Sequence, residues 1–283
     1  MQDMNENIFD FTTTDGIILK AVSWNNEAPP KAIIAIVHGH GEHKMRYKHV
    51  GEHFTNNGYL VIAMDNRGHG ESSGKKGHSP SHDQLVDDVE QFLATIRVMH
   101  NDIPIILYGH SMGGNIVANY ALKRKTSELK GVILTSPMFK LAFDPPKWKV
   151  TLGNMMANIW PSLIQPTGLE TKHISTDLEE VKKYEQDTLI HDKMSAGLFT
   201  GLMEAADWAI DHVSELALPA LVMHGTEDHI ISYEGSKMFS ENADDKVSLK
   251  LWEGMYHELQ NEKEKDKVLE YMLNWTEKLV VGG

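Results

Sequence analysis

A serine flanked by glycines occurs in the segment Gly109-His110-Ser111-Met112-Gly113. It follows the β-branched run Ile103 to Tyr108, and a helical pattern begins at Asn115. A strand, a sharp turn and a helix in this order expose a serine hydroxyl at the tip of a strained turn, where it can attack a carbonyl carbon. Flanking glycines permit the close approach of main chains that such a turn requires. Ser111 is therefore predicted to be a nucleophile, with the Met112 N–H beside the developing oxyanion.

A serine hydroxyl is a weak nucleophile near neutral pH unless a base and an orienting carboxylate assist it. Asp228 comes shortly after the apolar run Ala220 to Met223, and His257 comes shortly after Val247 to Trp252. The chain order serine, aspartate, histidine is the order expected for a nucleophile in this setting. We predict His257 as the base and Asp228 as its partner, with Glu227 as the competing acid.

The histidine-rich segment His38-Gly39-His40-Gly41-Glu42-His43 follows the run Ala32 to Val37 and allows two interpretations. In the first, the main-chain N–H of His40 is the second donor to the oxyanion. In the second, the segment resembles the zinc loop His-x-His-x-Asp-His of metallo-β-lactamase-like hydrolases. Glutamate replaces the expected aspartate, and a zinc site would leave the serine pattern unexplained, so we favour the first interpretation.

A further glycine-rich segment, Asp65 to Ser72, follows another apolar run. Its spacing matches neither a P-loop nor a dinucleotide fingerprint. We therefore expect a structural role, in which Asp65 and Arg67 tie loops together beneath the site.

From about Lys31 onward, short β-branched runs alternate with longer helical patterns, which is typical of an α/β fold. Helical spacing between Leu85 and Ile96, and again between Val268 and Leu279, predicts helices that pack on the sheet. The runs Ile8 to Thr13 and Ile17 to Trp24 predict an antiparallel hairpin at the sheet edge. We expect an α/β-hydrolase fold, a mainly parallel central sheet with helices on both faces. The predicted parallel strands are Ala32 to Val37, Tyr59 to Met64, Ile103 to Tyr108, Gly131 to Thr135, Ala220 to Met223 and Val247 to Trp252.

The alternation stops between residues 138 and 209, where methionine, tryptophan and proline are frequent and no strand pattern occurs. A segment inserted between strands of a regular sheet usually covers the strand ends where α/β folds bind ligands. We predict a helical cap at 138–209, inserted into a hydrolase core formed by residues 1–137 and 210–283.

The amino-acid composition limits the binding partners and the chemistry that this chain can have. The 283 residues carry a formal charge of −13, which disfavours nucleic acid and anionic membranes as constant partners. Cysteine is absent, so a thiol nucleophile and disulfides are excluded. No signal peptide pattern opens the sequence, which favours a cytoplasmic location.

These motifs together resemble the monoacylglycerol lipases and related lysophospholipases. The resemblance extends from about Phe9 to the last helix, and it is weakest in the predicted cap. It rests on the segments His38 to His43, Arg46-Tyr47, Asp65 to Ser72, Gly109 to Gly114 and Gly254-Met255-Tyr256-His257.

The resemblance implies a catalytic triad of Ser111, Asp228 and His257, with an oxyanion hole formed by the N–H groups of His40 and Met112. It also implies that a glycerol head group is surrounded by four side chains. Two departures bear on head-group preference: His40 replaces a residue that is often small or apolar, and Gln260 replaces a histidine found in some members. The four head-group positions are Glu42, Arg46, His110 and Tyr184.

The sequence therefore predicts a carboxylic ester hydrolase that releases fatty acid from monoacylglycerols or similar single-chain esters through an acyl-enzyme. No metal or organic cofactor is expected. The methionine-rich cap should form an apolar channel for the acyl chain and make transient contact with membranes. We expect a monomer or a homodimer.

Other activities remain open. A lysophospholipase or a general carboxylesterase would use the same chemistry, and a scaffold without catalysis would use the same fold. A serine aminopeptidase would need acidic cap residues to hold a substrate amine. The candidates for that role are Glu170, Asp177, Glu179 and Glu180.

Overall fold

The computed structural model describes residues 4–144, 147–243 and 245–282. Its main feature is an eight-stranded sheet with the strand order β1-β2-β4-β3-β5-β6-β9-β10. Strands β3 to β10 of this sheet run parallel, whereas the pairs β1–β2 and β2–β4 are antiparallel. The strands are β1 (Asn5–Thr12), β2 (Ile18–Asn25), β3 (Ile33–Val37), β4 (Leu60–Met64), β5 (Ile105–His110), β6 (Leu129–Thr135), β9 (Ala220–Gly225) and β10 (Val247–Trp252).

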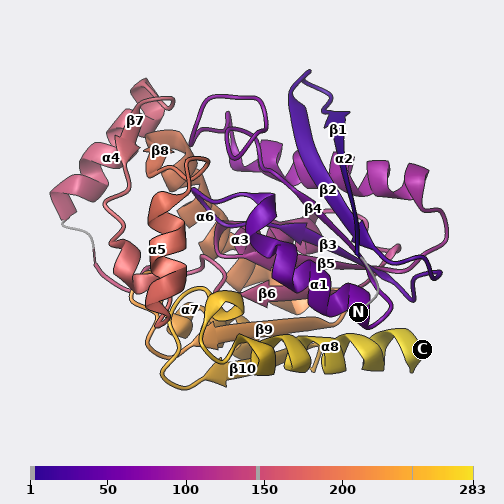
Figure 1. The fold of residues 1–283 in the computed structure, drawn as a ribbon. Coiled ribbons are helices and arrows are strands. Elements are labelled where there is room, and N and C mark those ends of the chain that lie inside the picture. Colours follow the sequence, from indigo (N-terminus) through magenta and orange to yellow (C-terminus); the bar gives the residue numbers. More distant parts are fainter. Residues whose placement is uncertain (1–3, 145–146, 244, 283) are drawn as a thin grey trace.

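Helices cover both faces of the sheet (Figure 1). Successive strand residues point to opposite faces, so Ile33 and Ala35 pack in one buried cluster and Ile34 and Ile36 in the other. The first cluster includes side chains of α2, α3, α6 and α7, and the second includes side chains of α1 and α8. The predicted α/β class is confirmed. The helices are α1 (Lys48–Asn56), α2 (His82–Met99), α3 (Met112–Lys123), α6 (Ala196–His212), α7 (Tyr233–Glu241) and α8 (Lys265–Val281).

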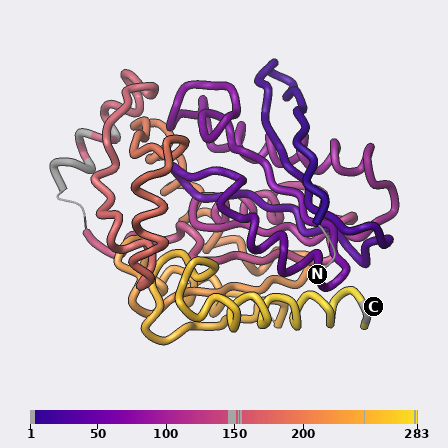
Figure 2. The backbone as a smooth tube through the Cα atoms, viewed as in Figure 1, coloured from indigo at the N-terminus to yellow at the C-terminus, as the bar shows by residue number. Residues whose placement is uncertain are grey.

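The segment between β6 and β9 comprises residues 136–219, and its part up to residue 195 gathers at one end of the molecule, away from both termini (Figure 2). It contains α4 (Lys147–Ile159), α5 (Leu178–Gln186) and the short antiparallel pair β7 (Ile164–Pro166) and β8 (Lys193–Ser195). Sequence alone gave no sign of these two strands, because three residues are too few for an alternating pattern.

Helix α6 also lies within this segment, but it packs against α3 and α2. Its buried residues Leu202 and Ala206 belong to the main core cluster. The predicted cap boundary at residue 209 therefore falls inside a helix that contacts the core.

Four short 3-10 helices complete the secondary structure of the described residues. None of the helices in this described part is both long enough and apolar enough to span a bilayer. The 3-10 helices are η1 (Lys44–Tyr47), η2 (Thr171–His173), η3 (Val213–Glu215) and η4 (Leu259–Asn261).

Two buried ion pairs hold the glycine-rich loop after β4. The Lys44 ammonium lies 2.8 Å from an Asp65 oxygen. The Arg67 guanidinium donates two hydrogen bonds of 2.6 Å to Asp88, and it also reaches Asp15. Asp65 and Arg67 thus tie loops together, as the sequence predicted.

Replacing Arg67 tests how much its buried ion pair with Asp88 contributes to the stability of the protein. Arg67→Met leaves the Asp88 carboxylate buried without its partner, and we expect the free energy of unfolding to fall by about 3 kcal/mol. Urea unfolding with an unchanged m value measures this loss.

Arg124→Met is the matched control. Its pair with Asp87 is a third or more exposed on both sides, so its loss should cost less than about 1 kcal/mol. Equal losses in the two variants would contradict a special role for the buried pair.

Candidate active site

Ser111 occupies a sharp turn between β5 and α3. Its φ of 52° and ψ of −116° lie in a region that side chains rarely adopt. The surrounding main chains leave no space for other residues at the flanking glycines: a Cβ on Gly113 would lie 2.1 Å from the Val37 carbonyl oxygen, and a Cβ on Gly109 would lie 2.4 Å from the Gly113 oxygen. The turn has the features of a nucleophile elbow, which is what the glycine spacing predicted.

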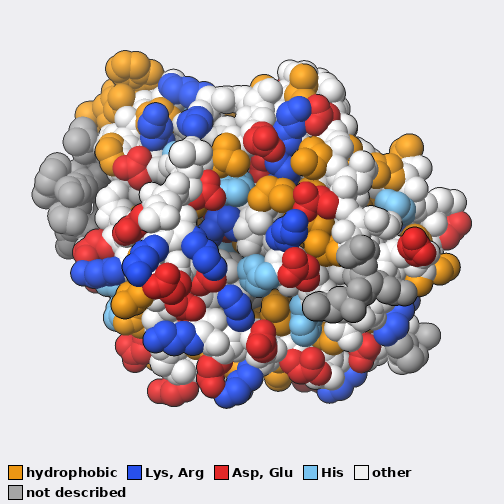
Figure 3. All heavy atoms as spheres, viewed as in Figure 1, with side chains coloured by type: hydrophobic (Ala, Val, Ile, Leu, Met, Phe, Trp, Pro, Cys, Tyr) orange, Lys and Arg blue, Asp and Glu red, His pale blue; other side chains and the backbone are white. Residues whose placement is uncertain are grey.

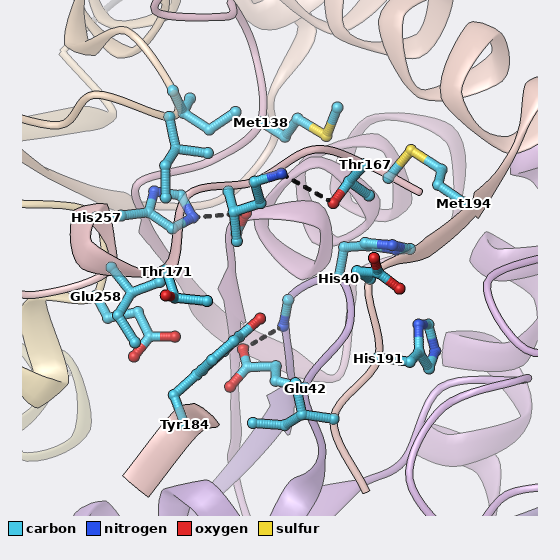
Figure 4. Close-up of a pocket in the computed structure, with 18 of the residues that line it drawn as sticks. His40, Glu42, Met138, Thr167, Thr171, Tyr184, His191, Met194, His257 and Glu258 are labelled. Atoms are coloured by element: carbon cyan, nitrogen blue, oxygen red, sulfur yellow. Dashed lines mark hydrogen bonds between the residues drawn. The ribbon is translucent and has the colours of Figure 1, made fainter. Parts of the chain in front are cut away.

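The three residues predicted as a triad form one chain of hydrogen bonds (Figure 4). The His257 Nδ1–H donates to Asp228 Oδ2 at 2.6 Å, because a carboxylate can only accept. With Nδ1 protonated, the Nε2 atom of His257 accepts the Ser111 hydroxyl at 2.9 Å. All three side chains are buried, although they come from the ends of three different strands.

Further groups fix the Asp228 carboxylate. Its Oδ1 atom accepts the N–H groups of Ile230 and Ile231 at 2.8 and 2.9 Å. The buried His224 ring lies 3.1 Å from Oδ2. Burial alone would raise the pKa of Asp228, but His257 and the hydrogen bonds outweigh burial and hold the pKa well below its usual range. Asp228 is therefore ionised. Glu227, the competing acid, is exposed.

The pKa of His257, the predicted base, is shifted in the opposite direction. Burial alone would lower the pKa of His257, but the neighbouring Asp228 carboxylate outweighs it and raises the pKa above 6.5. The charges of Glu258 and Glu42 raise it further. The Ser136 hydroxyl donates to the His257 carbonyl oxygen at 2.7 Å and fixes the main chain there.

Both predicted oxyanion donors lie where the sequence placed them. Met112 is the first residue of α3, and His40 lies in the loop after β3. Within the described ranges, neither main-chain N–H donates to a protein acceptor. The His40 ring packs edge-on against His69 and His191, and burial lowers its pKa to about 3, so the ring is neutral.

The histidines of the same loop do not converge on a metal position. His38 donates to the Gly39 carbonyl and accepts the Asn66 N–H. His43 pairs with Asp187 at 2.8 Å. Across the residues that the structure describes, no group of three or more histidine or acidic side chains could hold a metal ion. The rival zinc interpretation therefore lacks its ligand geometry.

A cavity of about 490 Å³ lies next to Ser111 and His257. In Figure 4, Met138 and Met194 lie on one side of His257, whereas Glu42, Tyr184 and Glu258 lie on the other. The cavity thus has methionines at one end and the carboxylates at the other, where Ile174 and Ile190 also pack in one cluster with Tyr184. The apolar lining consists of Met138, Leu141, Phe143, Leu169, Ile174, Ile190, Met194, Phe199, Ile230 and Ile231, most of them from residues 136–219.

Three of the four residues implied for the head group line this cavity: Glu42, His110 and Tyr184. Burial lowers the pKa of His110 to about 4, so its ring is neutral. Arg46 is not part of the lining. Its guanidinium lies 4.8 Å from the centre of the Tyr184 ring and binds Glu42 at 3.0 Å.

Glu258 is a lining residue that the sequence interpretation missed. Its two oxygens accept both terminal nitrogens of Arg46 at 2.6 and 2.7 Å, and the Asn261 amide donates to one of them. Its position directly after His257, the predicted base, was the only available signal. Gln260, the other departure near His257, is buried and lies outside the cavity lining.

The acidic residues considered for an aminopeptidase do not line the cavity. They are engaged on the surface instead. Glu170 pairs with Lys172, Asp177 caps α5, Glu179 pairs with Lys182, and Glu180 pairs with Lys183 and Lys265.

Comparison with known proteins agrees with this fold and geometry. A family model described as "Serine aminopeptidase, S33" matches residues 28–264, so the chain belongs to this family of α/β-hydrolases. Within it, the chain is 31% identical to the monoacylglycerol lipase of Mycolicibacterium smegmatis, over 94% of this chain and 95% of that protein. The resemblance to monoacylglycerol lipases is thereby confirmed.

Two further relatives extend the comparison. The chain is 35% identical, over 96% of its length, to an uncharacterized abhydrolase domain-containing protein of Dictyostelium discoideum, and it spans 29% of that protein. The crystal structure of the Paleococcus ferrophilus monoacylglycerol lipase superposes with a TM-score of 0.81 at 27% identity, covering 100% of both chains.

The raised pKa of His257 sets the pH dependence of Ser111 reactivity. Neutral His257 is needed to accept the serine proton, so the rate of labelling by an alkyl fluorophosphonate should rise with pH. The midpoint of this rise is expected above pH 6.5.

Asp228→Asn removes the charge that raises the pKa of His257 and disturbs its tautomer. We expect the maximal rate to fall by about 10⁴-fold. Asp211→Asn, at an exposed position of α6, is the control. A midpoint below pH 6.5 in the wild type, or equal rates in the two variants, would contradict this account.

Proposed function

We propose that this protein is a serine carboxylic ester hydrolase that cleaves monoacylglycerols or similar single-chain esters. The observation that carries the proposal is the hydrogen-bonded series Ser111–His257–Asp228 beside a cavity with methionines at one end and carboxylates at the other. The identity to a monoacylglycerol lipase over nearly the whole of both chains supports the substrate class.

In the proposed reaction, Ser111 Oγ attacks the ester carbonyl carbon while His257 Nε2 accepts the hydroxyl proton. The N–H groups of His40 and Met112 receive the negative charge that develops on the carbonyl oxygen. His257 then donates its proton to the leaving alcohol, and an acyl-enzyme remains. Water, deprotonated by the same imidazole, attacks the acyl-enzyme and releases the fatty acid.

The two ends of the cavity suit the two parts of such a substrate. Each buried methylene of an acyl chain contributes about 0.8 kcal/mol, and flexible Met138 and Met194 side chains can adapt to chains of different length. The end with Glu42 and Tyr184 would receive the alcohol. We infer that residues 138–195 form the cap, because this part supplies most of the lining.

Substitution of the nucleophile tests the proposal directly. Ser111→Ala should lower kcat for 1-monoacylglycerols by about 10⁶-fold and abolish labelling by a fluorophosphonate. A series of monoacylglycerols of increasing chain length, followed by fatty-acid release, gives the rates.

Ser240→Ala, on α7, is the control and should retain full activity. Activity that survives in Ser111→Ala but disappears with a chelator would overturn the serine mechanism and restore the zinc interpretation.

We also propose that the cap contacts lipid surfaces transiently. Ile159 and Trp160, at the end of α4, are 72% and 56% exposed, and Figure 3 shows hydrophobic side chains gathered at this end of the molecule. Exposed apolar side chains of this size favour an interface with lipid.

Liposome flotation measures this contact. Replacing both Ile159 and Trp160 with serine should reduce the fraction of protein that floats with the vesicles. Val98→Ser, an 88% exposed site on α2, is the control and should leave the fraction unchanged. Absence of any floating wild-type protein would contradict the proposal.

A further inference from the structure

One end of the cavity is rich in carboxylates. Glu42 and Glu258 are buried beside the triad, and Glu185, Asp187 and Asp192 line the more exposed part. Among the described residues that line the cavity, none is lysine or arginine. A substrate head group at this end therefore meets acidic side chains without a lining cation.

The nearest buried cation does not neutralise this charge. Arg46 binds Glu42 through one nitrogen and Glu258 through two, so a single positive charge lies between two negative ones. Burial lowers the pKa of the nearby His110 and His40 rings, so neither adds a positive charge. Without Glu258 the Arg46–Glu42 pair would be neutral; Glu258 makes the buried group net negative.

A second and independent feature points to a ligand here. Tyr184 is only 8% exposed, and its hydroxyl has no hydrogen-bond partner among the described residues. The hydroxyl is not among the fully buried polar atoms of the described residues that lack a partner, so it is accessible from the cavity and can pair with a substrate. In Figure 4 the hydroxyl points toward the centre of the site. A hydroxyl oxygen close to the charges of Glu258, Glu42 and Asp192 suits a cationic group on the substrate.

The same carboxylates disfavour the binding of an anionic head group. Phosphate and carboxylate groups are bound by arginine, lysine or clustered N–H donors. Here the guanidinium of Arg46 is already held by two carboxylates and covered by the Tyr184 ring. An anionic head group would have to displace those bonds and lie next to Glu258.

We propose that Glu258 makes the head-group end of the cavity selective for charge, so that the enzyme also hydrolyses fatty acyl esters of cationic amino alcohols and rejects esters with anionic head groups. This inference rests on the proposed function and extends it to a second substrate class. The chemistry is unchanged: the Ser111 Oγ–acyl bond forms, the bond from the acyl carbon to the amino alcohol oxygen breaks, and the Ser111 proton passes through His257 to that oxygen. Water then releases the fatty acid, whose carboxylate the acidic lining repels.

An isosteric pair of substrates tests the selection. Lauroylcholine carries a quaternary ammonium, and 3,3-dimethylbutyl laurate has the same shape without the charge. We expect kcat/KM to be at least about 10-fold higher for lauroylcholine at low ionic strength, which is about 1.4 kcal/mol. The ratio should decrease as salt is added.

The anionic arm compares 1-lauroylglycerol with 1-lauroylglycerol 3-phosphate. We expect kcat/KM for the phosphate ester to be at least about 10-fold lower than for the neutral ester at low ionic strength. A phosphate ester cleaved as fast as the neutral one would overturn the rejection of anions.

Glu258→Gln should reduce the ratio of kcat/KM for lauroylcholine to kcat/KM for 3,3-dimethylbutyl laurate about 10-fold, whatever its effect on the rate for the neutral ester. The same variant should lower the pKa of His257, because Glu258 raises it, so the activity profile should move to lower pH. The two substrates are therefore compared at a pH where His257 is neutral in both proteins. A role of Glu258 in packing alone would move neither the charge preference nor the pH profile.

Asp192→Asn provides a second variant at an exposed lining position, where folding is not at risk. It should reduce the preference in the same direction but by a smaller factor. Glu179→Gln is the matched control, since Glu179 is exposed, pairs with Lys182 and lies outside the lining.

The possible outcomes distinguish a failure of the charge selection from a failure of the proposed ester hydrolase activity. Equal rates for the isosteric pair in the wild type, with no change in Glu258→Gln or Asp192→Asn, would overturn the charge selection and leave the ester hydrolase intact. Protein that is labelled by a fluorophosphonate but cleaves none of the four esters would overturn the proposed function instead. If Glu258→Gln fails to fold, Asp192→Asn and the salt dependence of the wild-type ratio decide the question.

Discussion

The close approach of α3 to the end of β3 is the constraint on which the site depends. The Gly113 Cα lies so near the Val37 carbonyl that no side chain fits, and this contact keeps Ser111 at a positive φ. A residue in that conformation costs free energy, which the packed sheet and helix must supply. The same contact brings the N-terminus of α3 and the loop after β3 to one point. The predicted nucleophile and both candidate oxyanion donors thus lie around one backbone contact.

Burial has different effects on the ionisable groups around that contact. It keeps the rings of His40 and His110 neutral: no carboxylate raises the pKa of His40, and for His110 the charges of Glu42 and Glu258 do not outweigh burial and the neighbouring His257. His257 experiences the same desolvation, but the Asp228 carboxylate 2.6 Å away outweighs it and raises its pKa. Histidines in the same buried region therefore differ in pKa according to whether a carboxylate is hydrogen-bonded to the ring.

Sequence patterns predicted the parts of the site that depend on strand ends. Ser111, Asp228 and His257 each follow a strand that was recognisable from its apolar run, and parallel strands bring such positions to one edge. Glu258 was missed because its importance depends on Arg46, which is 212 residues away along the chain. The strands β7 and β8 were missed because their pairing is set by tertiary contacts rather than by a local pattern. Interactions between distant segments were thus the part that sequence could not supply.

The segment between β6 and β9 is bound to the same loops that form the site. The His191 N–H donates to the Gly41 carbonyl beside the predicted oxyanion donor, and the Glu258 N–H donates to the Ile174 carbonyl. The first bond joins this segment to the loop after β3, and the second joins it to the residue after His257. Because the cavity lining and the predicted triad share these main-chain contacts, a change in this segment that moves Ile174 or Tyr184 also acts on the position of His257. Under the proposed function, selection of the alcohol and the chemistry of its release are therefore coupled through the backbone.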